Sequence, residues 1–380
     1  MDQVRFGVIG VGGMGQGHCD NMKKIGEIRL AAVCDCDAVT AEKVGKQHGV
    51  PHFTDSSALL DSGLCDAVLI ATPHPERPPI AIAAMKAGRH VLCEKPLSER
   101  VSTADKIIAT ARRTGVAFGV MFQRRTEPMW IKAMEIVRSC RLVTLYRRTL
   151  ISPEYRTQTY YDSGAWRATW TGEGGGVMLN QSPHILDLFI QIGGMPQTVY
   201  GHTQTSMHRI EVEELAMALL TYADGGVGQF YCSTTEAGPD QVMEIYGDKG
   251  KLIYREKRLR FFQFETPVSE FTKTCPKMWA APACTEQPLE IPAGESGHSV
   301  ITRNFARHIL FGEKLIAPGE DGLQSLELAN AVWLSADRKA PVRLPLSRKG
   351  YDEFLARKRR ASKLQKKGGT RRVTDPQHQR

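Results

Sequence analysis

Short apolar runs alternate with helix-like segments over the first third of the chain, and this pattern restricts the fold more than any other feature. The runs are continuously apolar, and between residues 4 and 122 they are VRFGVIG, IRLAAVCD, CDAVLIAT, HVLCEKP and VAFGVMF. Strands that are buried on both faces of a sheet have such sequences, and helices between them connect parallel neighbours. The sequence therefore predicts an α/β domain with a doubly wound parallel sheet over residues 1–122.

The pattern changes after residue 122. Segments such as LVTLYRRTLI and VMEIYGDKGKLIYRE alternate apolar and polar residues, and ADGG and GDKG are typical hairpin turns. Helices are predicted at MWIKAMEIVRS, SVITRNFARHILFG and DGLQSLELANAVWLSADRK, whereas residues 265–298, rich in Pro, Ala and Thr, predict a long loop. We therefore expect a second α/β domain with a mostly antiparallel sheet over residues 123–346, followed by a tail over residues 347–380.

The net charge of +9 comes from the tail. Residues 347–380 contain 12 Lys and Arg against 3 Asp and Glu, a difference of +9, so residues 1–346 carry no net charge. We expect the tail to be helical at first and solvated, with an anionic partner as the alternative. No nucleic-acid-binding motif accompanies it, so nucleic acid is not an expected partner.

The compartment is predicted from absent features. No apolar run approaches the roughly 20 residues that cross a bilayer, and the N-terminus lacks the pattern of a signal peptide. We therefore expect a cytoplasmic protein without a membrane partner. The nine cysteines include no C-x-x-C pair, which favours buried, reduced thiols and indicates neither a disulfide framework nor a metal site.

A glycine-rich turn follows the first predicted strand and opens a helix. Its pattern is G-x-G-x-x-G, which in this context indicates a dinucleotide site. Gly10 allows the tight turn, Gly12 lets the backbone approach a pyrophosphate, and Gly15 permits close packing of helix and strand. The residues predicted to contact the cofactor here are Gly10, Gly12, Gly13, Met14 and Gly15.

An acidic residue follows at the sequence spacing that is typical of a residue contacting the ribose. Asp35 closes the second predicted strand, twenty residues after Gly15. A carboxylate there can bind both ribose hydroxyls of NAD and would repel the 2′-phosphate of NADP. Because Cys36 and Asp37 follow, and not an arginine, we expect NAD to be the cofactor.

The segment CEKPLS follows the fourth predicted strand. Parallel sheets bind ligands at the carboxyl ends of their strands, so Lys95 is expected near the reacting half of the cofactor. A lysine there can hold a substrate hydroxyl and favour the alkoxide during oxidation. On its own, Lys-Pro after a strand is also compatible with an ordinary loop.

Three segments in this order, GVIGVGGMGQGH, CEKPLS and GGGVMLNQSPHILDL, resemble the Gfo/Idh/MocA family of oxidoreductases. The resemblance covers roughly residues 4–260, and the segment from Tyr160 to Leu188 is similar to a subgroup of sugar-type dehydrogenases. It implies an N-terminal Rossmann domain and a C-terminal α/β domain with the catalytic site between them. It also implies that the second domain has an open sheet that often carries the contact of a homo-oligomer, here a dimer or tetramer.

The resemblance implies roles for residues of this chain. Lys95 takes the place of the family's catalytic lysine and His184 that of its histidine, whereas Asn180 stands where the family usually has an aspartate. An amide cannot act as a base, so Asn180 is expected to hold a substrate or cofactor hydroxyl. In ATPHPERPP, His74 replaces an asparagine and Arg77 a histidine of the family pattern. The further cofactor contacts implied in this way are Thr72, Pro73, His74, Glu94, Lys95 and Arg167.

The spacing in EGGGVMLNQSPHILDL leaves two alternatives. At helical spacing Asn180 and His184 share one face, with Asp187 a turn further on. Ser182-Pro183 is also a good helix start, in which case Asn180 lies on the preceding loop. We expect His184 to take the hydroxyl proton with help from Lys95, and Asp187 to be structural, although it could orient the imidazole. The glycines would let the chain pass close to cofactor and substrate.

The expected activity is an NAD-dependent oxidation of a secondary hydroxyl of a sugar, a sugar derivative or a cyclitol. Aromatic faces suit sugar rings, which makes a small group of residues candidates for a substrate platform. These are Tyr155, Arg156, Tyr161 and Trp170. Two alternatives are an NAD-dependent glycosidase that oxidises its sugar transiently and a non-catalytic NAD-sensing regulator. Retention of both Lys95 and His184 argues against the regulator.

Overall fold

The computed structural model describes residues 2–238 and 241–364, so most of the charged end of the tail lies outside the described residues. The residues group into two compact units, and each unit is made of three segments of the chain. Unit 1 comprises Met1–Arg141, Pro183–Gly194 and Leu289–Glu327. Unit 2 comprises Leu142–Ser182, Met195–Pro288 and Leu328–Arg380. The domain bounds expected from the sequence stay a prediction.

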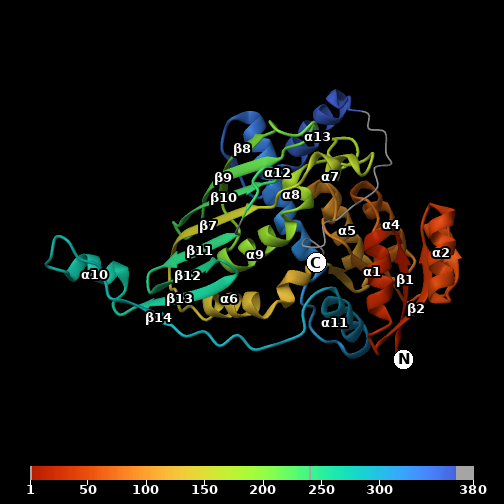
Figure 1. Cartoon of the computed structure of the whole chain (residues 1–380), viewed down its shortest axis with the longest axis horizontal. Helices are drawn as coiled ribbons and strands as arrows, with labels where there is room; N and C mark the ends of the chain where they lie inside the picture. The colour runs from red at the N-terminus through yellow and green to blue at the C-terminus, as the bar shows by residue number, and fades with distance from the viewer. Residues whose placement is uncertain (1, 239–240, 365–380) are drawn as a thin grey trace. The chain divides into compact units, whose positions relative to one another are not determined.

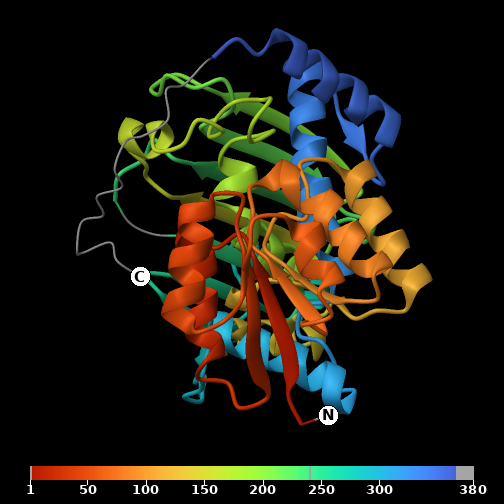
Figure 2. The ribbon, with the colours of Figure 1, turned by 90° about the vertical axis from the view of Figure 1, so that its right-hand side faces the viewer.

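Unit 1 contains a six-stranded, fully parallel sheet with helices on either side of it (Figures 1 and 2). The order β3-β2-β1-β4-β5-β6 is that of the Rossmann fold. The strands are β1 (Val4–Ile9), β2 (Ile28–Cys34), β3 (His52–Phe53), β4 (Ala67–Ile70), β5 (His90–Cys93) and β6 (Phe118–Val120). The predicted doubly wound domain is thus confirmed. Strand β3 was not predicted, because two residues show no periodicity.

The helices of unit 1 come mostly from the N-terminal segment. They are α1 (Gly13–Met22), α2 (Ala38–His48), α3 (Ser56–Asp61), α4 (Arg77–Lys86), α5 (Val101–Thr114) and α6 (Pro128–Arg138), with the 3-10 turns η1 (His74–Glu76), η2 (Gln123–Thr126) and η3 (Gly319–Asp321). Later segments add α9 (Pro183–Gly193) and α11 (His298–Phe311). Helix α12 (Gly322–Arg338) runs through the boundary between the two units.

Unit 2 is built on a nine-stranded sheet in the order β14-β13-β12-β11-β7-β10-β9-β8-β15. Strands β7 and β10 pair in parallel and all other neighbours are antiparallel, which confirms the predicted mostly antiparallel sheet. The strands are β7 (Leu145–Pro153), β8 (Thr198–Gln204), β9 (Leu215–Thr221), β10 (Val227–Ser233), β11 (Val242–Gly247), β12 (Gly250–Arg255), β13 (Arg258–Phe264), β14 (Cys284–Gln287) and β15 (Val342–Arg343).

The segment predicted as a long loop, residues 265–298, is partly ordered into regular structure. It contains helix α10 (Val268–Thr274) and strand β14, which pairs with β13 at the edge of the sheet (Figure 1). Strand β14 has the sequence CTEQ and is largely exposed, so no apolar alternation marks it. The expectation of a loop was therefore wrong for α10 and β14. An edge strand such as β14 is held by backbone hydrogen bonds, so its side chains need not show a pattern that reveals it in the sequence.

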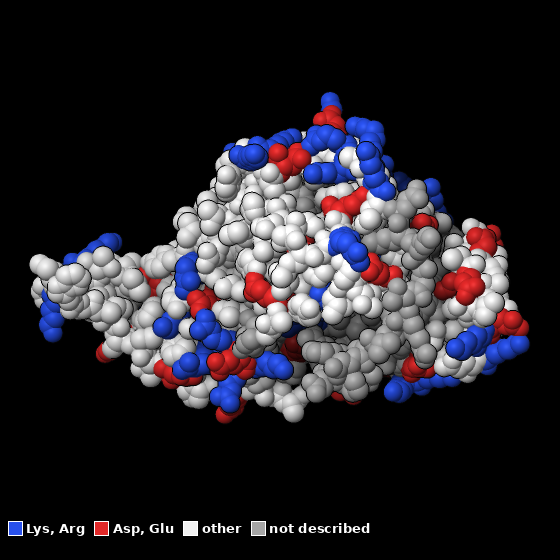
Figure 3. Space-filling model, turned by 45° about the horizontal axis from the view of Figure 1, so that its top comes forward, with Lys and Arg blue, Asp and Glu red and all other residues white. Residues whose placement is uncertain are grey.

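The remaining helices of unit 2 are α7 (Gln158–Asp162), α8 (Val177–Asn180) and α13 (Arg348–Ala361). Helix α13 confirms that the tail begins as a helix, and its sequence has six Lys and Arg against two Asp and Glu. Blue side chains gather near the top of Figure 3, in the region of this helix. The continuation of the tail over residues 365–380 lies outside the described residues.

Two expectations from composition can be compared with the structure. Within the described part of the chain, no helix combines the length and the apolar character needed to cross a membrane. All nine cysteines are described and none is in a disulfide, but only five are buried; Cys36, Cys140 and Cys284 are exposed. The expectation of buried thiols therefore fails for these three, which lie in surface segments.

Candidate functional site

The glycine-rich turn has the geometry of an anion-binding loop. Gly10 has a φ of +87°, and a Cβ there would lie 2.8 Å from the backbone nitrogen of Thr72. A Cβ at Gly15 would lie 1.9 Å from the Gly10 carbonyl oxygen, so helix and loop pack too closely for a side chain. A Cβ at Gly12 would meet nothing within 4 Å, and no side chain caps helix α1. The helix N-terminus is thus open on the side where a phosphate would bind.

Asp35 lies directly after β2 and faces this turn. One carboxylate oxygen accepts the backbone N–H of Val11 at 2.9 Å, and the other accepts that of Asp37 at 3.0 Å. Each oxygen has a second lone pair, so the carboxylate can still accept hydroxyl groups. Its neighbour Asp37 instead caps helix α2 through Thr40.

The loops that follow β4 and β5 are joined by a buried arginine. The Arg77 guanidinium donates to the Thr72 carbonyl at 2.8 Å and to the carbonyls of Lys95 and Pro96 at 2.6 and 2.8 Å. His74, in the turn η1, is buried beside it. Arg77 therefore fixes the backbone on which Lys95 is placed, a role that the sequence analysis did not assign to it.

The carboxylate of Glu94 is turned into the protein. It bonds His18 at 2.9 Å and accepts the backbone N–H of Lys95 at 3.2 Å. Burial would raise the pKa of Glu94, but the hydrogen bond from His18 and the nearby charges of Arg77 and Lys95 lower it below its usual value. The carboxylate is therefore occupied by these partners. The predicted contact of Glu94 with the cofactor would have to come from its backbone, or from its side chain in a different rotamer.

His184 lies near the beginning of helix α9, which starts at Pro183. The alternative with a helix start at Ser182-Pro183 is therefore confirmed, and Asn180 ends the separate short helix α8. Gln123 lies 3.3 Å from His184 Nε2, and the Phe122 ring packs edge-on against the imidazole. His184 Nδ1 has no hydrogen-bond partner among the described residues.

The surroundings of His184 keep its imidazole neutral. Burial lowers its pKa well below 6.5, and the positive charge of Lys95 lowers it further. The other charged or titratable groups that act on the ring are Glu94, Arg124 and His298. A neutral imidazole beside a lysine is a combination that can accept one proton and stabilise a negative oxygen.

Asp187 has the structural role that we favoured. Its carboxylate is buried and forms two hydrogen bonds with Arg125, at 2.7 and 2.5 Å. Arg125 also pairs with Asp321 at 2.6 Å. This ion pair anchors helix α9 to the turn η2, which carries Gln123, so it acts on His184 through the backbone.

The glycine run in unit 2 is explained by packing within that unit. A Cβ at Gly175 would lie 2.4 Å from the Trp333 ring, and one at Gly176 would lie 1.8 Å from the Glu213 carbonyl oxygen. Packing therefore accounts for Gly175 and Gly176, and our expectation that the glycines make room for cofactor and substrate stays a prediction. The Glu213 carboxylate accepts the backbone N–H groups of Gly176 and Met178, and burial raises its pKa to about 7.

Asn180 belongs to a polar network around Tyr160. The Tyr160 hydroxyl donates to Asn180 Oδ1 at 3.2 Å and accepts N–H groups of Arg167 at 2.8 Å and Gln181 at 3.0 Å. The Asn180 amide donates to the buried carboxylate of Glu173. A carboxylate, that of Glu173, is therefore hydrogen-bonded to Asn180, the position for which the resemblance implied an aspartate.

The residues predicted as a sugar platform divide into two groups. Tyr155 is 50% exposed, and Arg156 binds the Glu154 carboxylate and carbonyl. Tyr161 is 3% exposed with its hydroxyl on Thr234, and Trp170 is 8% exposed with its indole N–H on the Glu211 carbonyl. A platform role does not agree with the burial of Tyr161 and Trp170, which pack into the core of unit 2.

Several residues around His184 in unit 1 and around Asn180 in unit 2 were missed in the sequence. Tyr160 directly precedes Tyr161, which was predicted as part of the sugar platform. The sequence YY does not show which of the two hydroxyls joins the network around Asn180. Gln123 and Glu173 lack a motif of their own. Only contacts between distant segments identify them, although a polar residue directly after a parallel strand, as at Gln123, is a usable signal.

Comparisons with known proteins agree with the geometry. Residues 4–122 match the family described as "Oxidoreductase family, NAD-binding Rossmann fold", and residues 130–253 match the "GFO/IDH/MocA C-terminal domain". A myo-inositol 2-dehydrogenase of Thermotoga maritima is 24% identical over 90% of this chain and 98% of its own length. A scyllo-inositol 2-dehydrogenase (NAD(+)) of Bacillus subtilis is 26% identical over 66% of this chain and 73% of its own.

Solved structures with the same fold include the WlbA dehydrogenase of Bordetella pertussis, crystallised with NADH and UDP-GlcNAcA. It is 26% identical, with a TM-score of 0.79 over 91% of this chain and 100% of the other. A levoglucosan dehydrogenase in complex with NADH is 19% identical, has a TM-score of 0.76 and covers the same shares, which shows the fold alone.

Proposed function

Because the chain belongs to the GFO/IDH/MocA family of oxidoreductases, we propose that it moves a hydride between NAD and a secondary hydroxyl of a sugar, a sugar derivative or a cyclitol. The observation that carries the proposal is the set of loops at the carboxyl edge of the parallel sheet. The glycine-rich turn, Asp35, Thr72 and Lys95 lie in the segments that follow β1, β2, β4 and β5, and the charge of Lys95 acts on the His184 imidazole.

The residues of unit 1 fit NAD. The open N-terminus of α1 suits the pyrophosphate, and the Asp35 carboxylate suits the hydroxyls of a ribose. When bound, the nicotinamide supplies the hydride acceptor for oxidation, and the chain's own residues handle the proton.

Proton transfer is assigned to His184 and Lys95. A hydride leaves carbon readily only as the hydroxyl proton is lost, so the site needs a base and a donor that stabilises the alkoxide. The neutral His184 imidazole takes the proton. The Lys95 ammonium donates a hydrogen bond to the developing alkoxide.

Asn180 and Arg167 are assigned to substrate or cofactor hydroxyls. Asn180 lies four positions before His184 in the sequence, and Tyr160 and Glu173 hold the Asn180 amide in place. Asn180 can bind but not ionise, so its contribution is to orientation.

The test is a panel of candidate substrates with NAD, monitored by the appearance of NADH. It includes inositols, free and anhydro sugars, and nucleotide-linked sugars, because the relatives named above act on or bind such compounds. Net NADH from at least one compound supports the proposal. Release of an aglycone from a glycoside without net NADH identifies a glycosidase instead.

Cofactor choice gives a second, independent prediction. The unmodified chain is expected to bind NAD more tightly than NADP, and Asp35→Ala with Cys36→Arg to weaken NAD about 10- to 100-fold, since hydrogen bonds to a charged group contribute about 1.5–3 kcal/mol. Asp37→Ala is the matched control, because that carboxylate caps α2. Fluorescence titration with both cofactors is the measurement, and tighter NADP binding by the unmodified chain contradicts the assignment of Asp35.

The expected homo-oligomer remains a prediction. What supports it is an exposed face of the nine-stranded sheet, where the apolar side chains Tyr200, Met217, Leu219 and Val227 on β8, β9 and β10 are between 45% and 59% exposed. Neighbouring exposed apolar side chains of this kind are typical of contact surfaces.

A further inference from the structure

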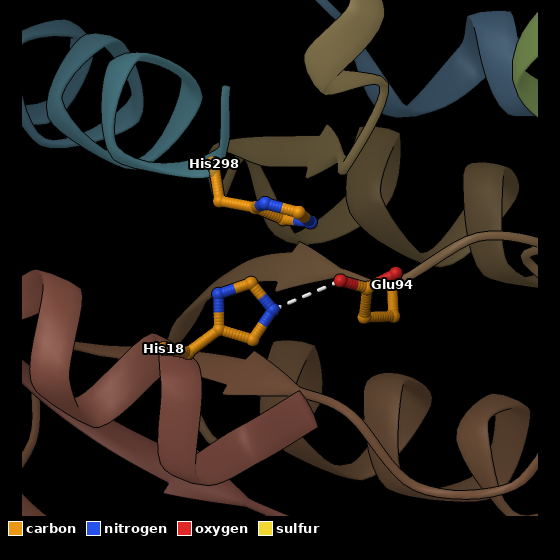
Figure 4. Close-up of side chains that lie close together, drawn as sticks. All are labelled: His18, Glu94 and His298. Carbon is orange, nitrogen blue, oxygen red and sulfur yellow. Dashed lines mark hydrogen bonds and ion pairs between the residues drawn. The ribbon is translucent and has the colours of Figure 1, made fainter. Parts of the chain in front are cut away.

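Two histidines and a glutamate of unit 1 converge on one point. His18 comes from helix α1, Glu94 from the loop after β5, and His298 is the first residue of α11. One potential ligand atom of each lies within 4.8 Å of the other two, and His18 Nε2 is 2.9 Å from Glu94 Oε1. Figure 4 shows both rings and the carboxylate turned toward one another.

We propose that His18, Glu94 and His298 form a binding site for a divalent first-row transition-metal ion. Two imidazole nitrogens and one carboxylate oxygen are a ligand set that Zn²⁺, Fe²⁺ and Co²⁺ accept, with further positions left for water or another ligand. The site was not foreseen because the sequence expectation rested on cysteine spacing, whereas 76 residues separate His18 from Glu94.

One of the three separations already suits a metal centre. Two ligands at right angles around an ion, each at about 2.1 Å, are about 3 Å apart, and the His18–Glu94 pair already has this separation. His298 has to approach by rotation of its side chain. It is half-buried whereas His18 and Glu94 are buried, so it lies on the side from which an ion can enter.

The charge around the site sets its strength. The Glu94 carboxylate is the one anionic ligand, and the cations Arg77 and Lys95 act on it. We therefore expect binding to be weaker than at a structural zinc site with thiolate ligands. An ion here would join α1, the loop after β5 and α11, and would thereby raise the thermal stability of the chain.

The test is titration of the metal-free, untagged full chain with Co²⁺, followed by visible absorption and by metal analysis after gel filtration. One equivalent is expected to bind. His298→Ala should weaken binding at least 100-fold, because loss of a direct ligand exceeds the 10- to 100-fold effect of an outer partner. His308→Ala is the matched control, since His308 lies on the same helix and bonds the Glu313 carbonyl, away from His18 and Glu94 in the sequence and on a different turn from His298.

Two further measurements distinguish binding at this site from binding elsewhere on the protein. Cobalt bound at exposed Cys36, Cys140 or Cys284 would give a thiolate charge-transfer band, and this band is expected to be absent. Glu94→Gln, which keeps the shape of the side chain, should also lose the ion. Failure to bind one equivalent, or equal binding by His298→Ala and His308→Ala, would overturn the proposal. Neither readout depends on dehydrogenase activity.

Discussion

Replacing Lys95 or His184 by alanine is expected to lower kcat/KM by a factor on the order of 10²–10⁴, while NAD still binds. The reason is the division of labour proposed above: His184 removes the hydroxyl proton and Lys95 stabilises the alkoxide. Both effects are confined to the reaction, because the contacts that shape the cofactor loop come from Gly10, Asp35 and Arg77. The measurement is steady-state turnover of a substrate from the panel, with cofactor affinity measured in parallel.

The dependence of kcat/KM on pH distinguishes the two roles. His184 must be neutral to act as a base, and its lowered pKa means that it stays neutral to a lower pH than a free histidine. The acidic limb of the unmodified enzyme should therefore lie below pH 6.5, the ordinary value for this group. Lys95→Ala should keep this limb but shift it to higher pH, because the charge of Lys95 no longer lowers the pKa of His184, and His184→Ala should lose it.

Lys86→Ala and His202→Ala are the matched controls, since both side chains are exposed on α4 and β8. They should leave turnover and its pH profile unchanged. Near-full turnover by His184→Ala with the acidic limb intact would mean that the base is misassigned, and Lys95 would then be the next candidate.

Replacing Arg125 by methionine is expected to lower the free energy of unfolding by about 3–5 kcal/mol. The substitution leaves the Asp187 carboxylate buried without its main partner and also removes the bond to Asp321. An unpaired buried charge is among the most destabilising changes in a core. Urea unfolding monitored by fluorescence and circular dichroism measures the loss.

Two further variants test whether the loss of stability comes from the burial of the Arg125–Asp187 pair. Arg112→Met removes the exposed pair with Glu320 and should change stability by less than about 1 kcal/mol. Arg125→Met combined with Asp187→Leu should recover part of the loss, because an apolar pair of similar size carries no desolvation penalty. Equal effects of Arg125→Met and Arg112→Met would show that the buried pair does not anchor α9.

The sequence alone determined the features that depend on neighbouring residues. Continuous apolar runs predicted the parallel sheet of unit 1, alternation predicted the antiparallel sheet of unit 2, and the glycine pattern predicted the turn between β1 and α1. These signals are local because secondary structure responds to the period of side chains along the chain. Strands β3 and β14 were not foreseen, because they are short and held by pairing with a neighbour.

Only the tertiary structure decided what each site residue contacts. His184 meets Gln123, Asp187 meets Arg125, and the glycine run meets Trp333 and Glu213, each across more than 30 residues of chain. The same holds for His18, Glu94 and His298, which three separate elements bring together. The physical reason is that burial and hydrogen bonding are satisfied in space: a polar side chain in a folded core bonds whichever group the packing brings within about 3 Å.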